Sequence, residues 1–155
     1  MRNIFRYLKT YPTQPLEVDR LIVSAFLEIN QLAVLENRFL LEYSITENQI
    51  QEWDSLVQFI EIINEEIDVF DIEKLIELFE FVISPSDRII NGAIYTPSDI
   101  RDYIVNESLK RDNLDLDNIK VADIACGCSG FLYTAVKELK RRTNNTYQYL
   151  SLIHI

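Results

Sequence analysis

The sequence contains few residues that break or cross-link a chain. Three glycines and four prolines among 155 residues exclude collagen-like and low-complexity interpretations. The two cysteines, Cys126 and Cys128, are too few for a secreted disulfide scaffold and too close together for an ordinary structural bridge. Because zinc usually takes four ligands and no second cysteine pair exists, we also expect no metal site.

Long apolar runs are missing as well. No run approaches the length of about 20 residues that spans a bilayer, and the first residues lack the apolar stretch of a secretion signal. Hydrophobic residues make up 48% of the chain and charged residues 26%, which is typical of a globular domain. We therefore expect a globular, cytoplasmic protein with no membrane partner.

Positive charge is scarce in the first part of the chain. Residues 1–90 carry 7 Lys and Arg against 17 Asp and Glu, whereas residues 91–155 carry 8 of each kind. An acidic surface repels phosphates, so the first part is not expected to be the main nucleic-acid contact. Its charge fits a solvated helical face, and a protein-docking face is the other interpretation.

Helical periodicity dominates that acidic part. Residues 1–16 contain two prolines and are predicted to be an extended lead-in. Apolar residues then recur at three- and four-residue steps from Val18 to Phe39. A second stripe begins at Ile50, after Thr46–Gln49, which has the form of a capping box, and a third runs from Ile72 to Val82. These stripes predict an antiparallel helical bundle, with Trp53 in its core.

A turn at Ser84–Asp87 predicts a boundary between a helical segment, residues 1–87, and a second part, residues 88–155. Beyond it, Thr96-Pro97 has the form of a helix start, with Thr96 as N-cap and Asp99 in the first turn. We expect this helix to reach Ser108 and to be followed by a polar loop over residues 109–118.

The most informative stretch follows that loop. Residues 119–125 are predicted to form a short strand, and Gly127 and Gly130 mark a turn after it. Residues 131–142 are predicted to form a helix, and residues 147–155 a second strand. Such a turn leaves backbone N–H groups at the helix start that bind anionic groups. Asp123, at the strand end, would orient a cationic or hydroxyl-bearing ligand. Neither a Walker loop nor a dinucleotide fingerprint is present.

Two segments carry a resemblance to a known family. Asp123-Ile-Ala-Cys-Gly-Cys-Ser-Gly-Phe-Leu132 resembles the S-adenosylmethionine-binding motif of DNA adenine-N6 methyltransferases, in particular the modification subunits of type I restriction systems and related type II enzymes. Asn91-Gly-Ala-Ile-Tyr-Thr-Pro97 resembles the element that precedes this motif in the same family. The resemblance implies the start of an α/β, Rossmann-like methyltransferase sheet after an α-helical N-terminal segment.

The resemblance also implies which residues contact the cofactor, S-adenosylmethionine. One side of the site would be lined by Tyr95, Thr96 and Pro97. The turn under the cofactor would be formed by Asp123, Ala125, Cys126 and Gly127, and the helix start by Ser129 and Gly130. Ser129 replaces a family glycine; if that position needs a positive φ, the serine costs about 1 kcal/mol.

The family's catalytic Asn/Asp-Pro-Pro-Tyr/Phe motif has no counterpart, because no proline follows Pro97. We therefore assign no catalytic residue and expect an N-terminal fragment of a methyltransferase that is inactive alone. The expected partners are DNA, through the missing downstream part, and specificity and restriction subunits. Residues 150–155 resemble translated adapter sequence and are expected to be non-native.

Two other interpretations remain open from the residues. One is a non-catalytic helical module in which residues 17–83 dock a partner and the glycine turn is merely structural. The other is a fragment of a nucleotide-binding oxidoreductase, which the cysteine in the turn and the Tyr-Thr-Pro element disfavour.

Overall fold

The computed structural model describes residues 1–11, 15–32, 37–82, 96–110, 114–116, 119–124 and 126–143. The chain divides into two compact units, Met1–Gly92 and Ala93–Ile155. The boundary that the sequence predicts, between residues 87 and 88, lies outside the described residues. Within the described parts, no helix combines the length and the apolar character needed to cross a bilayer.

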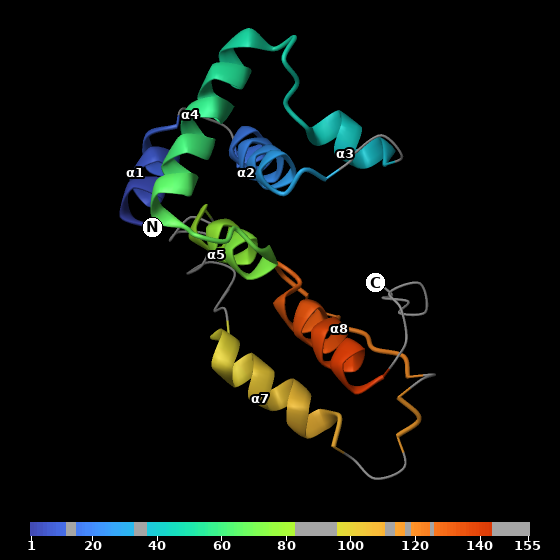
Figure 1. The fold of residues 1–155 in the computed structure, drawn as a ribbon. Coiled ribbons are helices and arrows are strands. Elements are labelled where there is room, and N and C mark those ends of the chain that lie inside the picture. Colours follow the sequence, from blue (N-terminus) through green and yellow to red (C-terminus); the bar gives the residue numbers. More distant parts are fainter. Residues whose placement is uncertain are drawn as a thin grey trace. The chain divides into compact units, whose positions relative to one another are not determined.

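The first unit is helical throughout its described secondary structure (Figure 1). Its helices are α1 (Arg2–Thr10), α2 (Pro15–Ile29), α3 (Arg38–Tyr43), α4 (Ile50–Glu66) and α5 (Ile72–Val82). Helices α1 and α2 both pack against α4 and against α5. The prediction of a helical bundle is therefore confirmed for this part of the chain.

Helix α1 replaces the extended lead-in that the sequence predicted, and that prediction is wrong. Ile4 and Leu8 lie one turn apart and are buried, so residues 2–10 gain a core-facing stripe as a helix. Pro12 restricts only the residue that follows the end of α1. Tyr11, which precedes Pro12, leaves the helix with extended backbone angles, as the residue before a proline prefers.

The long stripe from Val18 to Phe39 is divided between two helices. Helix α2 ends at Ile29, and Gln31 has a positive φ of 51° that no α-helix can continue through. The Asn30 side chain donates a hydrogen bond to the Phe70 carbonyl oxygen at 3.0 Å, which fixes this end of the helix. Asn37 then caps α3, because its Oδ1 accepts the Leu40 N–H at 3.1 Å.

Helix α5 begins where the sequence indicated, whereas α4 begins at Ile50, later than a Thr46 N-cap would place it. The Thr46 N–H donates to Gln49 Oε1 at 3.1 Å, which is half of the predicted capping box, although Gln49 rather than Thr46 is the N-cap of α4. Asp71 Oδ1 accepts the Lys74 N–H at 3.0 Å and caps α5. Trp53 packs against the core of this unit, as expected.

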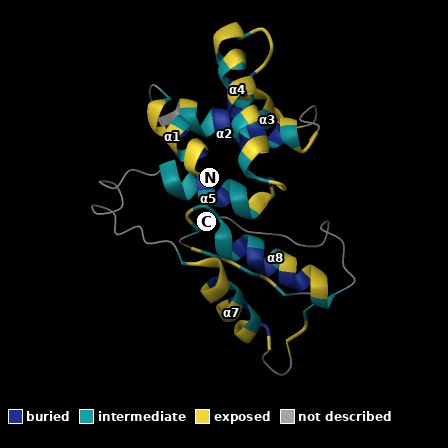
Figure 2. Ribbon diagram, turned by 60° about the vertical axis from the view of Figure 1, so that its left-hand side comes forward, coloured by how far each residue is buried: buried dark blue, intermediate teal, exposed yellow. Residues whose placement is uncertain are grey.

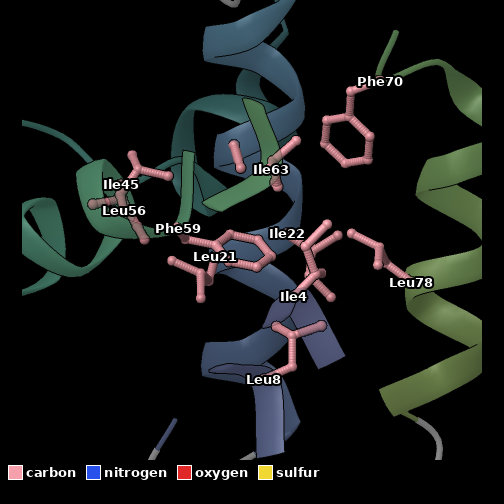
Figure 3. Packing of buried hydrophobic residues seen from close by; sticks show 11 residues of the cluster. Ile4, Leu8, Leu21, Ile22, Ile45, Leu56, Phe59, Ile63, Phe70 and Leu78 are labelled. Atoms are coloured by element: carbon pink, nitrogen blue, oxygen red, sulfur yellow. The ribbon is translucent and has the colours of Figure 1, made fainter. Parts of the chain in front are cut away.

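The core of the first unit draws side chains from all of its long helices (Figure 3). Phe59 of α4 is fully buried, and full burial of so large an apolar side chain contributes about 1.5–3 kcal/mol. Around it lie the other buried apolar residues of the cluster, which are Ile4, Leu8, Leu21, Ile22, Ala25, Ile45, Leu56, Ile63, Phe70 and Leu78.

The second unit is built on two helices that pack together, α7 (Ser98–Ser108) and α8 (Gly130–Arg142). Val105 and Leu109 meet Ala135 and Leu139 in a small core. Figure 2 shows the buried residues of α8 as a stripe along that helix. The predicted helix over residues 131–142 is thus confirmed, whereas Thr96 is not an N-cap, because α7 starts at Ser98 with Pro97 before it.

The predicted start of a Rossmann-like sheet is wrong for the part of the chain that the structure describes, which contains no strand. A strand of a parallel sheet covered on both faces would bury nearly every residue, but Ile124 is 84% exposed. Ile119 and Val121 instead pack, partly buried, against the core between α7 and α8. The second predicted strand, residues 147–155, lies outside the described residues.

Candidate functional site

The turn that precedes α8 has a left-handed backbone at two positions. Gly127 has a φ of 49° and Ser129 a φ of 62°. The Ser129 N–H donates to the Cys126 carbonyl oxygen at 2.7 Å, which closes the turn directly before Gly130 begins the helix. Ser129 thus has the positive φ that the sequence analysis considered for this position, and this conformation costs a serine about 1 kcal/mol relative to glycine.

Gly130 lies under the side chain of Arg101. A Cβ atom at this position would be 2.6 Å from Arg101 Nη1 and 3.2 Å from Cζ, which is closer than atoms can approach without one of them moving. Arg101 is only 4% exposed, and its backbone N–H donates to the Pro97 carbonyl oxygen at 2.9 Å. The first turn of α7 therefore contacts the first turn of α8 through one arginine and one glycine.

A polar chain holds Arg101 in this place. Its Nε donates to Thr134 Oγ1 at 2.9 Å, and the Thr134 hydroxyl donates to Asp102 Oδ1 at 3.3 Å. Thr134 is buried, so each of these hydrogen bonds replaces contacts with water that burial removes. The Thr134 hydroxyl thereby links the Arg101 guanidinium to the Asp102 carboxylate of the same helix, α7.

The opposite end of the helix pair is held by a second polar cluster. Glu138 accepts hydrogen bonds from Arg141, at 2.6 and 2.9 Å, and from Arg142. Arg142 also donates to the Leu109 carbonyl oxygen and to Asn106 Oδ1, each at 2.9 Å. Hydrogen bonds from Arg141 lower the pKa of Glu138 most, and those from Arg142 and the charges of both arginines lower it further, to about 2 from 4.5, against the opposing effect of burial.

Between α7, α8 and residues 119–124 lies a hollow of about 640 Å³, here called the α7–α8 hollow. Its walls are mainly apolar, and Lys120 and Asp123 are the charged residues among them. The volume lies within the range of about 300–1,000 Å³ that is common for small-molecule sites. The apolar walls include Ile104, Val105, Leu109, Leu114, Ile119, Val121, Ile124, Phe131, Leu132 and Ala135.

The predicted cofactor residues are only partly brought together. Asp123 lines the α7–α8 hollow, and the described residues that follow it form the turn before α8. Among the others, Gly127 and Pro97 are exposed, whereas Thr96, Cys126, Ser129 and Gly130 are half-buried. Tyr95 and Ala125 lie outside the described residues.

Sequence reasoning missed Arg101 and Thr134, the two buried polar residues at the centre of the site. Three apolar residues of α7, Ile100, Tyr103 and Ile104, are exposed, so the apolar pattern of this helix does not mark its buried face. The buried face of α7 is marked by Arg101 and Val105, which lie one turn apart and are the two buried residues of this helix. Their four-residue spacing is the sequence signal that could have identified Arg101.

The described residues offer no group of three or more His, Cys, Asp or Glu side chains that could hold a metal ion. Cys126 and Cys128, both within the turn, form no disulfide. What this part of the second unit can supply is a left-handed turn at a helix start, one carboxylate and an apolar hollow.

Comparisons of the chain with protein-family models, with curated proteins and with solved structures found no match.

Proposed function

We propose that the chain is part of a DNA adenine-N6 methyltransferase and that its second unit supplies part of the site for S-adenosylmethionine. The proposal starts from the resemblance of residues 91–97 and 123–132 to two elements of that family. The observation that carries it is the contact of Arg101 with Gly130. Through this contact, the helix that follows the Tyr-Thr-Pro element lies against the glycine turn, although about 30 residues separate them in sequence.

The chemistry of the described residues fits parts of this cofactor. Backbone N–H groups at the start of α8 suit a carboxylate such as that of the methionine moiety, because a helix N-terminus carries partial positive charge. The apolar walls of the α7–α8 hollow suit an adenine ring, and Asp123 suits an ammonium or a ribose hydroxyl. When bound, the cofactor supplies a methyl group on a sulfonium.

The residues of this chain would bind and orient, and would not hold the target base. Arg101 fixes the start of α8 against α7, so the turn is preorganised for a ligand. Holding a flipped adenine requires acceptors and a stacking ring, and the family's motif for this task is absent from the sequence. DNA, specificity subunits and restriction subunits are proposed as partners of the complete enzyme, in the cytoplasm.

The proposal is tested by calorimetric titration of the full 155-residue chain with S-adenosylmethionine. We expect saturable binding that Asp123→Asn weakens about tenfold, because a hydrogen bond to a charged group contributes about 1.5–3 kcal/mol. Asp115→Asn is the matched control, because it removes the same charge from an exposed position of the same unit. No heat of binding at millimolar cofactor, or equal weakening by both variants, would refute the proposal.

A transfer assay tests the second half of the proposal separately. With methyl-labelled S-adenosylmethionine and adenine-containing DNA, the chain alone should label no DNA, because its sequence lacks the family's motif for holding the base. Transfer above the level of a protein-free control would show that the chain holds adenine by other residues.

A further inference from the structure

A hollow of about 440 Å³ lies in the first unit between the end of α1 and the first half of α4. We call it the tyrosine hollow. It is lined by Tyr7, Thr10, Tyr11, Glu17, Gln51, Glu52 and Ser55, so two aromatic rings and two carboxylates face the same space. The proposed methyltransferase function uses none of these residues.

The aromatic part of the tyrosine hollow is fixed by the core. The Tyr7 ring stacks on buried Phe59 with centroids 5.5 Å apart, and its hydroxyl donates to the Ser55 carbonyl oxygen at 3.0 Å. Tyr11 stacks on Tyr7 with centroids 6.1 Å apart. A ligand therefore meets rings that are already ordered, which reduces the entropy lost on binding.

The charge around these rings is negative. Glu17 is exposed and makes no ion pair with the described residues. Glu52 pairs with Arg20 through Oε2 at 2.9 Å, so one negative charge of this group remains uncompensated. Burial raises the pKa of Tyr11, and the charges of Tyr7, Glu52 and Glu17 raise it further against the opposing effect of Arg20.

The end of α1 adds to this effect. Thr10 closes α1, and the last carbonyl groups of a helix carry partial negative charge that favours a cation nearby. The whole segment of residues 1–90 carries ten more acidic than basic residues, so a cationic partner is also attracted from a distance.

We propose that the tyrosine hollow binds an arginine side chain presented by a basic segment of a partner protein. A guanidinium is planar, stacks on aromatic faces and pairs with carboxylates through parallel hydrogen bonds. Tyr11, whose ring stacks on Tyr7, offers the aromatic face, and Glu17, which makes no ion pair with the described residues, offers the carboxylate. Nucleic acid is the poorer fit, because its phosphates would be repelled by the same charges.

The test uses the full chain with labelled tyrosine rings and a short capped peptide, Gly-Arg-Gly, followed by NMR titration. The arginine peptide should shift the ring signals of Tyr7 and Tyr11 in a saturable manner. A peptide with citrulline in place of arginine has the same shape without the charge and should leave those signals unmoved. Equal shifts from both peptides would overturn the proposal.

Two variants separate the tyrosine hollow from the general acidity of the unit. Glu17→Gln should raise the dissociation constant of the arginine peptide about threefold, the size expected for one exposed charge contact. Glu61→Gln removes the same charge from an exposed position of α4 that does not line the hollow, and it should leave the constant unchanged. Equal weakening by both variants would mean that the peptide follows net charge, and the proposal would fall.

Discussion

The start of α8 depends on the backbone conformation of Ser129 and on the space beside Gly130. Ser129 keeps a left-handed conformation that glycine would adopt more easily, whereas at Gly130 a Cβ atom would force the Arg101 side chain to move. The space above Gly130 is occupied by the guanidinium of buried Arg101, which Thr134 holds. Close approach therefore explains the glycine at position 130, and backbone conformation explains the glycine at 127.

Gly130→Ala should destabilise the second unit by about 1 kcal/mol. A helix normally gains about 0.5–1 kcal/mol when alanine replaces glycine, but a forced contact in a packed region costs about 1–3 kcal/mol. Amide hydrogen exchange in α8 measures the difference. In an Arg101→Ala background the clash is removed, so the same substitution should become neutral or stabilising; unchanged destabilisation there would rule out the clash.

Glu138 makes the stability of the second unit depend on pH. Its folded-state pKa is about 2 and its ordinary value is 4.5, chiefly because of hydrogen bonds from Arg141. A depressed folded-state pKa means that the ionised form stabilises the fold. That contribution is complete above about pH 4.5 and is lost as the pH falls towards about 2.

Protection of α8 amides should therefore decline from about pH 4.5 towards about pH 2, and Glu138→Gln should remove this part of the decline. Carbon NMR of the Glu138 carboxyl group measures its titration directly. Glu107→Gln is the control, because the Glu107–Lys110 pair is exposed and such pairs contribute little. A Glu138 midpoint near 4.5 would contradict the prediction.

Helix α1 is held at its start by a residue from another helix. Glu66, the last residue of α4, accepts the Asn3 N–H at 3.0 Å and the Ile4 N–H at 3.4 Å. The hydrogen bond from Asn3 is the largest cause of the lowered pKa of Glu66. The first N–H groups of a helix have no partner within it, so Glu66 does the work of an N-cap that Met1 cannot do.

Glu66→Ala should loosen the first turn of α1 and increase amide exchange there about fivefold, the effect of losing an ordinary N-cap. Glu65→Ala is the matched control, because the side chain of Glu65 is exposed and accepts neither of these hydrogen bonds. Two-dimensional NMR exchange experiments resolve the amides concerned. Equal acceleration in both variants would mean that the loss of charge, and not the loss of these bonds, loosens α1.

Helices with strong local signals were predictable from the sequence. Helix α5 combines a capping Asp71 with an unbroken apolar stripe, so both its start and its buried face were recognised. Helix α1 was not predictable in this way, because two prolines within residues 1–16 favour extended backbone, although Pro12 lies beyond the end of α1 and Pro15 is the first residue of α2. The division between α2 and α3 was missed because Leu32 fits the apolar period, although it is 49% exposed; only the left-handed Gln31 reveals the break.

The second unit shows a different limit of sequence analysis. The apolar run Ile119–Ile124 has strand composition, but a short apolar run serves equally well as a cover for helices. Here Ile119 and Val121 pack beside Val105 and Leu109, and the predicted sheet does not form in the described residues. The left-handed turn was predictable from Gly127, whereas the arrangement of Arg101, Thr134 and Gly130 depends on contacts between distant residues that no local pattern reveals.

The charge asymmetry of the chain has a consequence for the first unit as a whole. Residues 1–90 carry 17 acidic and 7 basic residues, so like charges repel one another across its surface. Exposed Glu61 and Glu65 lie four residues apart on α4, where two charges of the same sign destabilise a helix. The unit keeps its fold against this repulsion through the core around Phe59.

Added salt should therefore stabilise the first unit. Between about 0.15 M and about 1 M NaCl the Debye length falls from about 8 Å to about 3 Å, which screens the repulsion between surface carboxylates. Urea unfolding followed by Trp53 fluorescence should shift to a higher midpoint, because Trp53 packs against this core. Replacing Glu61 and Glu65 with glutamine should raise the midpoint at low salt and reduce its response to salt. A midpoint that falls with salt would show that ion pairs such as Arg20–Glu52 outweigh the repulsion.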